Sequence, residues 1–196
     1  MEPLTEKARN LIFEFEGIDQ PSDWPGGSSG ITIGIGYDLG YESADDFTSD
    51  WQPLLATGDF TTLSQVVGLK GTTAQAKASS LKTIKIKSSD AENVFLDRSV
   101  PKYQKLTQQA FPGVDDLPAD AQGALFSLVY NRGTSMDGDS RKEMRAIRDA
   151  VPNKDLQEIA DQLRAMKRLW EGKGLDGLLK RRDAEADLVE SCITTS

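Results

Sequence analysis

The segment 31–38, ITIGIGYD, limits the fold of this chain more than any other stretch. In an extended strand, successive side chains point to opposite faces, so its bulky residues share one face and its small or polar residues share the other. The bulky face comprises Ile31, Ile33, Ile35 and Tyr37. The second face comprises Thr32, Gly34, Gly36 and Asp38. We expect the first face to pack into a core and the second to leave its backbone open to a ligand.

Another carboxylate, Glu16, stands at the end of a predicted amphipathic helix over residues 4–16, which Gly17 ends. A loop rich in proline, glycine and serine follows over residues 20–30 and leads into the strand. Glu16 lies beside the apolar stripe of its helix, one turn after Ile12, where partial burial suits a general acid. Two carboxylates at one cleft are the smallest set of catalytic groups with which most glycosidases cleave a glycosidic bond.

The chain contains no histidine, which excludes Ser-His-Asp and Cys-His catalysis and every histidine-ligated zinc site. Its single cysteine, Cys192, cannot form an internal disulfide. Acid–base chemistry near neutral pH must therefore use Asp or Glu, and no metal or organic cofactor is expected. The net charge of −8 argues against nucleic acid as the main partner, because neutralising phosphates requires a basic surface.

The rest of the chain indicates helices, after a weakly patterned stretch over 41–70. Apolar residues recur most regularly over 118–131, at the spacing of a helix packed on a core. Thr72–Gln75 and Ser89–Glu92 fit the capping box and predict two helix starts. Pro101 predicts a kink or a break. The predicted helices lie near 73–81, 89–110, 118–131, 140–150, 155–170 and 176–190.

Three separated motifs resemble one family. FEG at the end of the first helix, with the TIGIG sequence over 32–36, is similar to the N-terminal motif of phage-type lysozymes of glycoside hydrolase family 24. The sequence ALFSLVYNRG at 124–133 resembles the buried central helix of that family. The sequence WEGKGLDGLLKRRDAEADL at 170–188 resembles its C-terminal motif. Because the three motifs occur in order at the beginning, middle and end, the resemblance covers most of the chain.

The resemblance implies a catalytic set, although the second carboxylate departs from the usual phage pattern. That pattern places an aspartate six residues before the threonine, where this chain has Gly26, and the nearest acid is Asp23. The sequence SGITIGIGYDLG is instead similar to the pesticin branch, in which the second carboxylate follows the threonine by six residues. The resemblance thus implies Glu16, Thr32 and Asp38 as the catalytic residues.

The six-residue spacing between Thr32 and Asp38 limits how both of them can belong to the catalytic set. A straight strand would separate the two residues by about 20 Å, too far for both to act on one sugar ring. We therefore predict a bend, and Gly34 or Gly36 is where a bulge or kink costs least. If the strand runs straight, Asp23 replaces Asp38 as the second carboxylate.

Glycan contacts are implied for three further residues. Tyr130 and Asn131 match the aromatic–amide pair of the family, and an amide can both donate to and accept from an N-acetyl group. The alternative for Asn131 is a helix C-cap. Trp24 lies in the turn beside the predicted site and is the tryptophan expected to stack on a sugar. Arg181 and Arg182 are expected in structural ion pairs.

The resemblance implies a mainly helical α+β fold with two lobes. One lysozyme-like domain would cover 1–196, with a small β-hairpin region in a lobe of about 1–70 and a helical lobe over about 71–196. It also implies a muramidase that hydrolyses the β-1,4 bond between N-acetylmuramic acid and N-acetylglucosamine in peptidoglycan. Glu16 would protonate the leaving oxygen, and Asp38 would position water or stabilise oxocarbenium-like charge. Inverting and retaining routes stay open, as do a lytic transglycosylase and a non-catalytic glycan-binding module.

The ends and the hydropathy of the chain bear on delivery. The first residues, MEPLTEKARN, lack a basic and apolar leader, so no signal peptide is expected. No apolar run approaches the roughly 18 residues of a membrane span, so no stable membrane insertion is expected. A monomer made in the cytoplasm would act on the cell wall in the periplasm of its host or of a target bacterium. As a phage endolysin it would need a holin, and as an antibacterial effector or bacteriocin it would need a secretion apparatus and an immunity protein.

Overall fold

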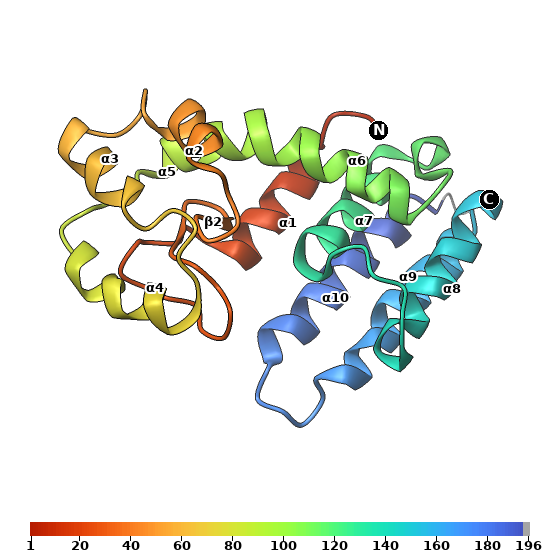
Figure 1. Cartoon of the computed structure of the whole chain (residues 1–196). Coiled ribbons are helices and arrows are strands. Elements are labelled where there is room, and N and C mark those ends of the chain that lie inside the picture. The colour runs from red at the N-terminus through yellow and green to blue at the C-terminus, as the bar shows by residue number, and fades with distance from the viewer. Residues whose placement is uncertain (194–196) are drawn as a thin grey trace. The chain divides into compact units, whose positions relative to one another are not determined.

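The computed structural model describes residues 1–193 as mainly helical, with one two-stranded antiparallel sheet (Figure 1). The predicted α+β, mainly helical fold with a small hairpin is confirmed. The chain forms two compact units: unit 1 is Met1–Phe15 with Pro101–Ser196, and unit 2 is Glu16–Val100. The expected lobes of about 1–70 and 71–196 within one lysozyme-like domain stay a prediction.

Unit 1 is built around one buried helix. Helix α7 (Ala119–Arg132) buries every residue from Ala121 to Val129, as the apolar pattern over 118–131 predicted. Beyond α1 (Glu6–Glu16), the other α-helices of this unit have these bounds: α6 Val100–Ala110, α8 Lys142–Ala150, α9 Leu156–Ala165 and α10 Asp176–Glu190. Helix α10 packs against α7 and α9, and α9 packs against α8.

A glycine lets α1 approach α7 closely. A Cβ atom on Gly123 would lie 2.4 Å from the Cβ atom of Ala8, far inside van der Waals contact. Helix α7 ends at a second glycine, Gly133, whose φ of 70° is the conformation glycine adopts at low cost. Its N–H donates to the Val129 carbonyl, so Gly133 caps the helix. The alternative in which Asn131 caps the helix is wrong, because Asn131 lies inside the last turn.

A buried ionic network joins α10 to α7. Glu185 Oε1 accepts a hydrogen bond from Ser127 Oγ at 2.6 Å and pairs with Arg182 Nη2 at 2.7 Å. Arg181 Nε lies 3.3 Å from the same oxygen. All four side chains are shielded from solvent. The ion pairs expected for the two arginines are confirmed, and loss of Glu185 would remove an anion with which both of these buried cations pair.

Unit 2 contains the hairpin and four short α-helices. Strand β1 is Thr32–Ile33 and strand β2 is Tyr37–Asp38. Trp51 is fully buried at the end of helix α2 (Ala44–Trp51), and its ring meets the Tyr37 ring edge-on, with centroids 5.7 Å apart. A Cβ atom on Gly34 would come within 3.0 Å of the same indole, so the hairpin turn sits directly on Trp51. The helices are α2 Ala44–Trp51, α3 Thr57–Ser64, α4 Gly71–Ala78 and α5 Ser88–Val94.

The two predicted capping boxes are wrong. Helix α4 begins at Gly71, with Lys70 at its N-cap, so Thr72 lies inside the first turn. The Gly71 N–H donates instead to the Ser29 carbonyl at 2.9 Å, a contact distant in sequence. Helix α5 likewise begins at Ser88, one residue before the predicted cap. A tertiary hydrogen bond thus accompanies the start of α4, and the local motif marks the start of neither helix.

The interruption predicted at Pro101 is present as a π-helix. The five residues Phe95–Ser99 form this segment between α5 and α6, and the Val100 N–H donates to the Phe95 carbonyl, five residues back. Proline has no N–H and its ring crowds the carbonyl four residues earlier, so a regular α-helix is costly at this point. The wider π turn accommodates the proline without ending the helical run.

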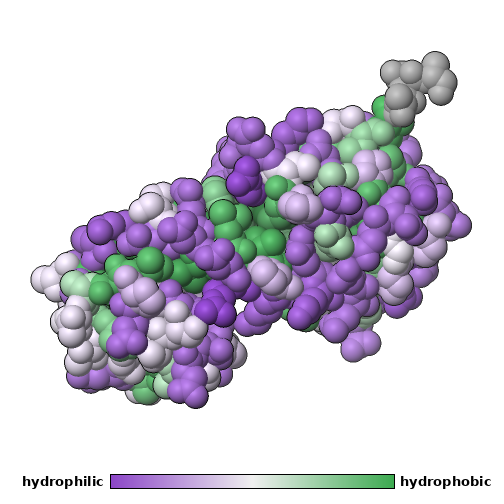
Figure 2. Space-filling view, turned by 90° about the horizontal axis from the view of Figure 1, so that it is seen from above, coloured by the Kyte–Doolittle hydropathy of each residue, from purple (hydrophilic) through white to green (hydrophobic). Residues whose placement is uncertain are grey.

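Hydrophilic residues cover most of the face that Figure 2 shows. Large exposed apolar side chains are limited to Tyr41, Leu175 and Ile193 within residues 1–193. Within the same residues, no helix combines the length and the apolar character needed to cross a bilayer.

Candidate active site

The hairpin brings Thr32 and Asp38 into register. The segment 31–38 does not form one strand as expected; it folds back on itself, so that Thr32 pairs with Asp38 and Ile33 pairs with Tyr37. Gly34 and Gly36 carry the reversal, with φ values of 63° and 66° that L side chains rarely adopt. Directly opposed residues of an antiparallel pair have Cα atoms about 4.5–5.5 Å apart. Thr32 and Asp38 are therefore close enough to act on the same sugar ring, as the predicted bend required.

Glu16 is the last residue of α1 and is half-buried. Gly17 follows with a φ of 67°, the left-handed conformation predicted for a residue that ends a helix. Two residues later the chain is tied to the hairpin turn. The Asp19 N–H donates to the Gly34 carbonyl at 2.6 Å, and the Gly34 N–H donates back to the Asp19 carbonyl at 3.0 Å. Glu16 is therefore three residues from a backbone pair with the turn that separates Thr32 from Asp38.

The Asp38 carboxylate joins two distant parts of the backbone. Its Oδ1 accepts hydrogen bonds from the N–H groups of Gly30 at 2.9 Å and Gly40 at 2.8 Å. Burial raises the pKa of Asp38 above its ordinary value, while the two N–H donors and the nearby charge of Lys70 act in the opposite direction. Because Oδ1 receives both strong contacts, Oδ2, with a single longer bond of 3.2 Å from Gly30, is the freer oxygen for a ligand or water.

We call the contacts of Asp38 with the N–H groups of Gly30 and Gly40 the Asp38 clamp. Neither glycine has room for a side chain. A Cβ atom on Gly30 would lie 2.4 Å from Asp38 Oδ1 and 2.3 Å from the Gly40 nitrogen. On Gly40, a Cβ atom would lie 2.8 Å from the Leu69 carbonyl oxygen. The close approach of backbone to backbone thus explains the two glycines that flank the hairpin in SGITIGIGYDLG, and these glycines are the sequence signal for the contacts of Asp38.

Thr32 offers an unengaged hydroxyl beside Asp38. Its residue is 7% exposed, and within residues 1–193 its hydroxyl has no hydrogen-bond partner. A hydroxyl can accept and donate at once. Thr32 and Asp38 together can therefore hold a water molecule.

Asp19 is an acidic residue of the site that the sequence analysis missed. Besides the backbone pair with Gly34, its side-chain Oδ2 accepts a hydrogen bond from the Gly36 N–H at 3.2 Å. Burial raises the pKa of Asp19 to about 6, and the charges of Glu16, Asp23 and Asp38 act in the same direction. The sequence signal was an acid three residues after Glu16, in EGID, between the predicted helix and the predicted loop.

Asp23 and Trp24 lie in the loop before the hairpin. Asp23 is exposed, and its carboxylate accepts a hydrogen bond from the Ser22 hydroxyl at 3.1 Å. The Trp24 indole N–H donates to the Ser29 carbonyl at 3.0 Å, which holds the ring in place while it remains half-buried. A ring fixed in this way can present one face to a sugar, which is compatible with glycan binding by Trp24. The role of Trp24 in glycan binding stays a prediction.

Tyr130 and Asn131 lie at the end of α7, in unit 1. Tyr130 belongs to an aromatic cluster, with ring centroids 4.4 Å from Tyr103 and 6.0 Å from Phe126, and is half-buried. Asn131 is exposed. The packing gives Tyr130 a structural role, while the exposed amide of Asn131 is accessible to a ligand. Their glycan contacts stay a prediction.

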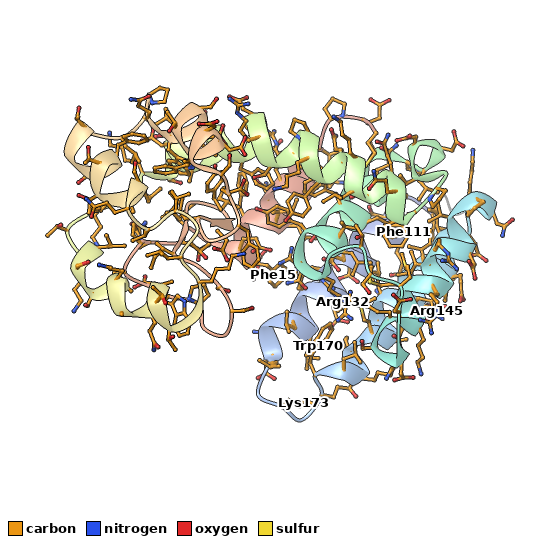
Figure 3. The ribbon with its side chains drawn as sticks, viewed as in Figure 1. Phe15, Phe111, Arg132, Arg145, Trp170 and Lys173 are labelled. Carbon is orange, nitrogen blue, oxygen red and sulfur yellow. The ribbon has the colours of Figure 1, made fainter. Side chains whose placement is uncertain are left out.

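Arg132 follows this pair and covers Trp170. Figure 3 shows the two side chains next to one another, and the guanidinium carbon lies 4.8 Å from the ring centroid. Burial lowers the pKa of Arg132 to about 10, and the positive charges of Arg141 and Arg182 act in the same direction. This stacking takes one face of the Trp170 ring, which leaves less of it for a sugar.

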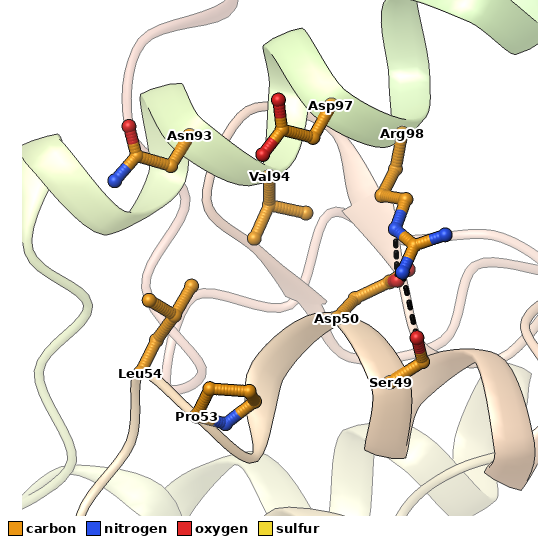
Figure 4. Close-up of a pocket in the computed structure, with 8 residues that line it drawn as sticks. All are labelled: Ser49, Asp50, Pro53, Leu54, Asn93, Val94, Asp97 and Arg98. Atoms are coloured by element: carbon orange, nitrogen blue, oxygen red, sulfur yellow. Dashed lines mark hydrogen bonds and ion pairs between the residues drawn. The ribbon is translucent and has the colours of Figure 1, made fainter.

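A surface cavity of about 260 Å³ lies in unit 2 (Figure 4). An ion pair between Arg98 Nε and Asp50 Oδ1, 2.6 Å apart, forms part of its wall. None of the predicted site residues lines it. Its lining residues are Ser49, Asp50, Pro53, Leu54, Asn93, Val94, Asp97 and Arg98. Within residues 1–193, no group of three or more His, Cys, Asp or Glu side chains is arranged to hold a metal ion.

Residues 58–185 match the sequence model of the phage lysozyme family. The chain belongs to the phage lysozyme family. A comparison with curated proteins finds no match. Membership indicates a glycoside hydrolase that degrades peptidoglycan and acts on the bacterial cell wall. The matched residues lie C-terminal to the hairpin, so the roles of Glu16, Thr32 and Asp38 rest on geometry and on the resemblance of their motif.

Proposed function

We propose that this lysozyme is a muramidase, which hydrolyses the β-1,4 bond between N-acetylmuramic acid and N-acetylglucosamine. Glu16 is the general acid that protonates the leaving glycosidic oxygen. Asp38 and Thr32 hold the attacking water or, in a retaining route, Asp38 stabilises the charge that develops on the sugar. Trp24, Tyr130 and Asn131 contact the glycan.

The pairing of Thr32 with Asp38 carries this proposal. It places a free hydroxyl beside a carboxylate that keeps one oxygen largely available, and the bridge from Asp19 ties both to the end of the helix that bears Glu16. Asp23 supports the alternative second carboxylate less well, because it is exposed and because the straight strand that would have required it is absent.

The catalytic role of Glu16 is tested by Glu16→Gln, which removes the titrating group and keeps the size of the side chain. Glu14→Gln is the matched control, since Glu14 is exposed on the same helix. We expect the first variant to lose at least about a hundredfold in peptidoglycan-clearing activity and the second to match the wild type. Equal clearing by Glu16→Gln and the wild type would contradict the proposal.

The products identify the reaction. Mass spectrometry of digested muropeptides should show reducing N-acetylmuramic acid ends, because a water molecule is consumed. Anhydromuramic ends would identify a lytic transglycosylase, which requires the acid but no second carboxylate. Absence of cleavage with retained binding to cell walls would identify a glycan-binding module.

For the biological setting, we propose a phage endolysin or an antibacterial effector or bacteriocin of the pesticin branch. Support for this branch comes from the position of Asp38 after Thr32. The genes beside this open reading frame test the setting. A holin gene would support release from an infected host, whereas a secretion gene with a small immunity gene would support delivery to another bacterium.

A further inference from the structure

Asp19 makes three hydrogen bonds with the turn of the hairpin. Two join its backbone to Gly34, at 2.6 and 3.0 Å, and the third runs from the Gly36 N–H to its carboxylate, at 3.2 Å. The backbone pair needs no particular side chain at position 19. The third contact depends on the carboxylate, and it fixes the far end of the turn.

The location of these bonds relates Asp19 to Glu16. Helix α1 holds Glu16 from its N-terminal side, and Gly17, with a φ of 67°, gives the chain freedom on the other side. The bonds from Asp19 to the turn remove that freedom within three residues. A displacement of about 1 Å in a catalytic group can cost about a hundredfold in rate, so a restraint at this point matters for the proposed reaction.

We propose that Asp19 is a positioning residue of the active site: its carboxylate fixes the hairpin turn that separates Thr32 from Asp38 against the end of the helix that carries Glu16. The inference rests on the muramidase function proposed above. Asp19 acts through the backbone of the turn and is not assigned a contact with substrate.

The charges around Asp19 support a functional reason for this carboxylate. The charged groups that act on it are Glu16 at the end of α1, Asp23 in the following loop and Asp38 on β2, and all three are carboxylates. Together with burial they make the ionised form unfavourable. An asparagine would supply the same acceptor oxygen at no such cost, so what the acid adds at this position is a contact whose strength changes with pH.

Ionisation of Asp19 also adds a pH dependence. A charged acceptor forms a stronger hydrogen bond than a neutral one. Since burial raises the pKa of Asp19 to about 6, the contact with the Gly36 N–H weakens as the pH falls through that value. We expect part of the acidic limb of the activity profile to come from this group.

Kinetics of Asp19→Ala and Asp19→Asn on purified peptidoglycan fragments test the proposal. Asp19→Ala removes the side-chain contact, and we expect kcat to fall about tenfold with KM within about twofold, as for a misplaced group that still binds substrate. Asp19→Asn keeps the acceptor oxygen, so we expect it to restore most of kcat at pH 7 and to lose the inflection near pH 6. Asp45→Asn, at an exposed position in the first turn of α2, is the control and should match the wild type.

Amide hydrogen exchange measures the contact directly. In Asp19→Ala we expect the Gly36 N–H to exchange faster and the Gly34 N–H, which donates to the backbone of residue 19, to keep its protection. The thermal midpoints of both variants at pH 7 should be no lower than that of the wild type, because each removes a partly buried charge. A fall in kcat then cannot be assigned to unfolding.

Two results would overturn the proposal. One is unchanged exchange at Gly36 in Asp19→Ala, which would show that the contact does not hold the turn. The other is an unchanged kcat despite faster exchange, which would show that the turn does not position the site. Failure of the muramidase function has a different signature, namely a wild type that releases no reducing ends or a Glu16→Gln variant of full activity.

Discussion

The Tyr37 hydroxyl donates a hydrogen bond to Asp50 Oδ2 at 3.0 Å and so ties the strand residue next to Asp38 to helix α2. Asp50 is 7% exposed and also pairs with Arg98. The hairpin is thus held at its turn by Asp19 and along its second strand by this contact. Burial and the neighbouring Asp50 charge raise the pKa of Tyr37 above its ordinary value, so the hydroxyl keeps its proton, and its role as donor, at a pH at which an ordinary tyrosine ionises.

Tyr37→Phe should lower the free energy of unfolding by about 1–2 kcal/mol, because a buried carboxylate loses one donor while keeping Arg98. Denaturant titration at pH 7 measures this. Tyr41→Phe is the control: Tyr41 is 59% exposed, and we expect a change within about 0.5 kcal/mol. An equal loss in both variants would show that the contact with Asp50 is not special.

Gly30→Ala should distort the Asp38 clamp, since its Cβ atom would lie 2.4 Å from the carboxylate oxygen and 2.3 Å from the Gly40 nitrogen. We expect loss of most peptidoglycan-clearing activity and a destabilisation of about 1–3 kcal/mol. Gly58→Ala, in α3 with open space around the added atom, is the control and should be neutral or stabilising by about 0.5–1 kcal/mol. Wild-type activity in Gly30→Ala would contradict the clamp.

Glu185→Gln should be the most destabilising of these substitutions. It removes the negative charge that Arg181 and Arg182 share in the interior of unit 1, and breaking a buried pair in this way costs about 3–5 kcal/mol. Thermal unfolding measures the effect. Asp183→Asn, which affects a partly exposed pair with Lys167, should cost at most about 1 kcal/mol. The network is not required for stability if the two variants unfold at the same temperature.

The stability of the protein should depend on pH through Asp19. Its pKa is about 6 in the folded protein and near 3.8 in the unfolded chain, so the folded state binds more protons between these values. The free energy of unfolding therefore falls as the pH rises from about 4 to about 6, and because Asp19 is only partly buried, solvent screening keeps this change well below the roughly 3 kcal/mol of the full shift. Asp19→Asn should be more stable than the wild type at pH 7, with the difference vanishing near pH 4. A constant difference across this range would assign the effect to another cause.

Sequence periodicity predicted those parts of the fold that local chemistry controls. The apolar repeat over 118–131 matches α7, and Pro101 marks a real interruption, because hydrophobic periodicity and a missing N–H act within one helix. The predicted starts of α4 and α5 were wrong by one or two residues, and at the start of α4 the Gly71 N–H bonds to the carbonyl of Ser29, which is distant in sequence. Boundaries of this kind depend on the finished fold.

The site was predictable only where its geometry depends on residues close together in the sequence. The distance argument between Thr32 and Asp38 led to a bend at the glycines, which the hairpin supplies. Asp19 escaped notice because its role depends on a bridge to Gly34, fifteen positions further along the chain, that no local pattern encodes. Pairwise spacing can thus predict a turn, whereas the partner of a loop residue requires the structure.

The division of the chain has a consequence for the order of folding. Unit 2 is one continuous segment, Glu16–Val100, whereas unit 1 combines the first residues with everything from Pro101 onward. During synthesis, unit 2 can therefore complete its own contacts at a stage when Gly123, which packs against Ala8, has not yet left the ribosome. Asp19, Thr32 and Asp38 lie in this early segment, as does Glu16 at the end of α1, so we expect the hairpin and the Asp38 clamp to form on the nascent chain before α1 packs against α7.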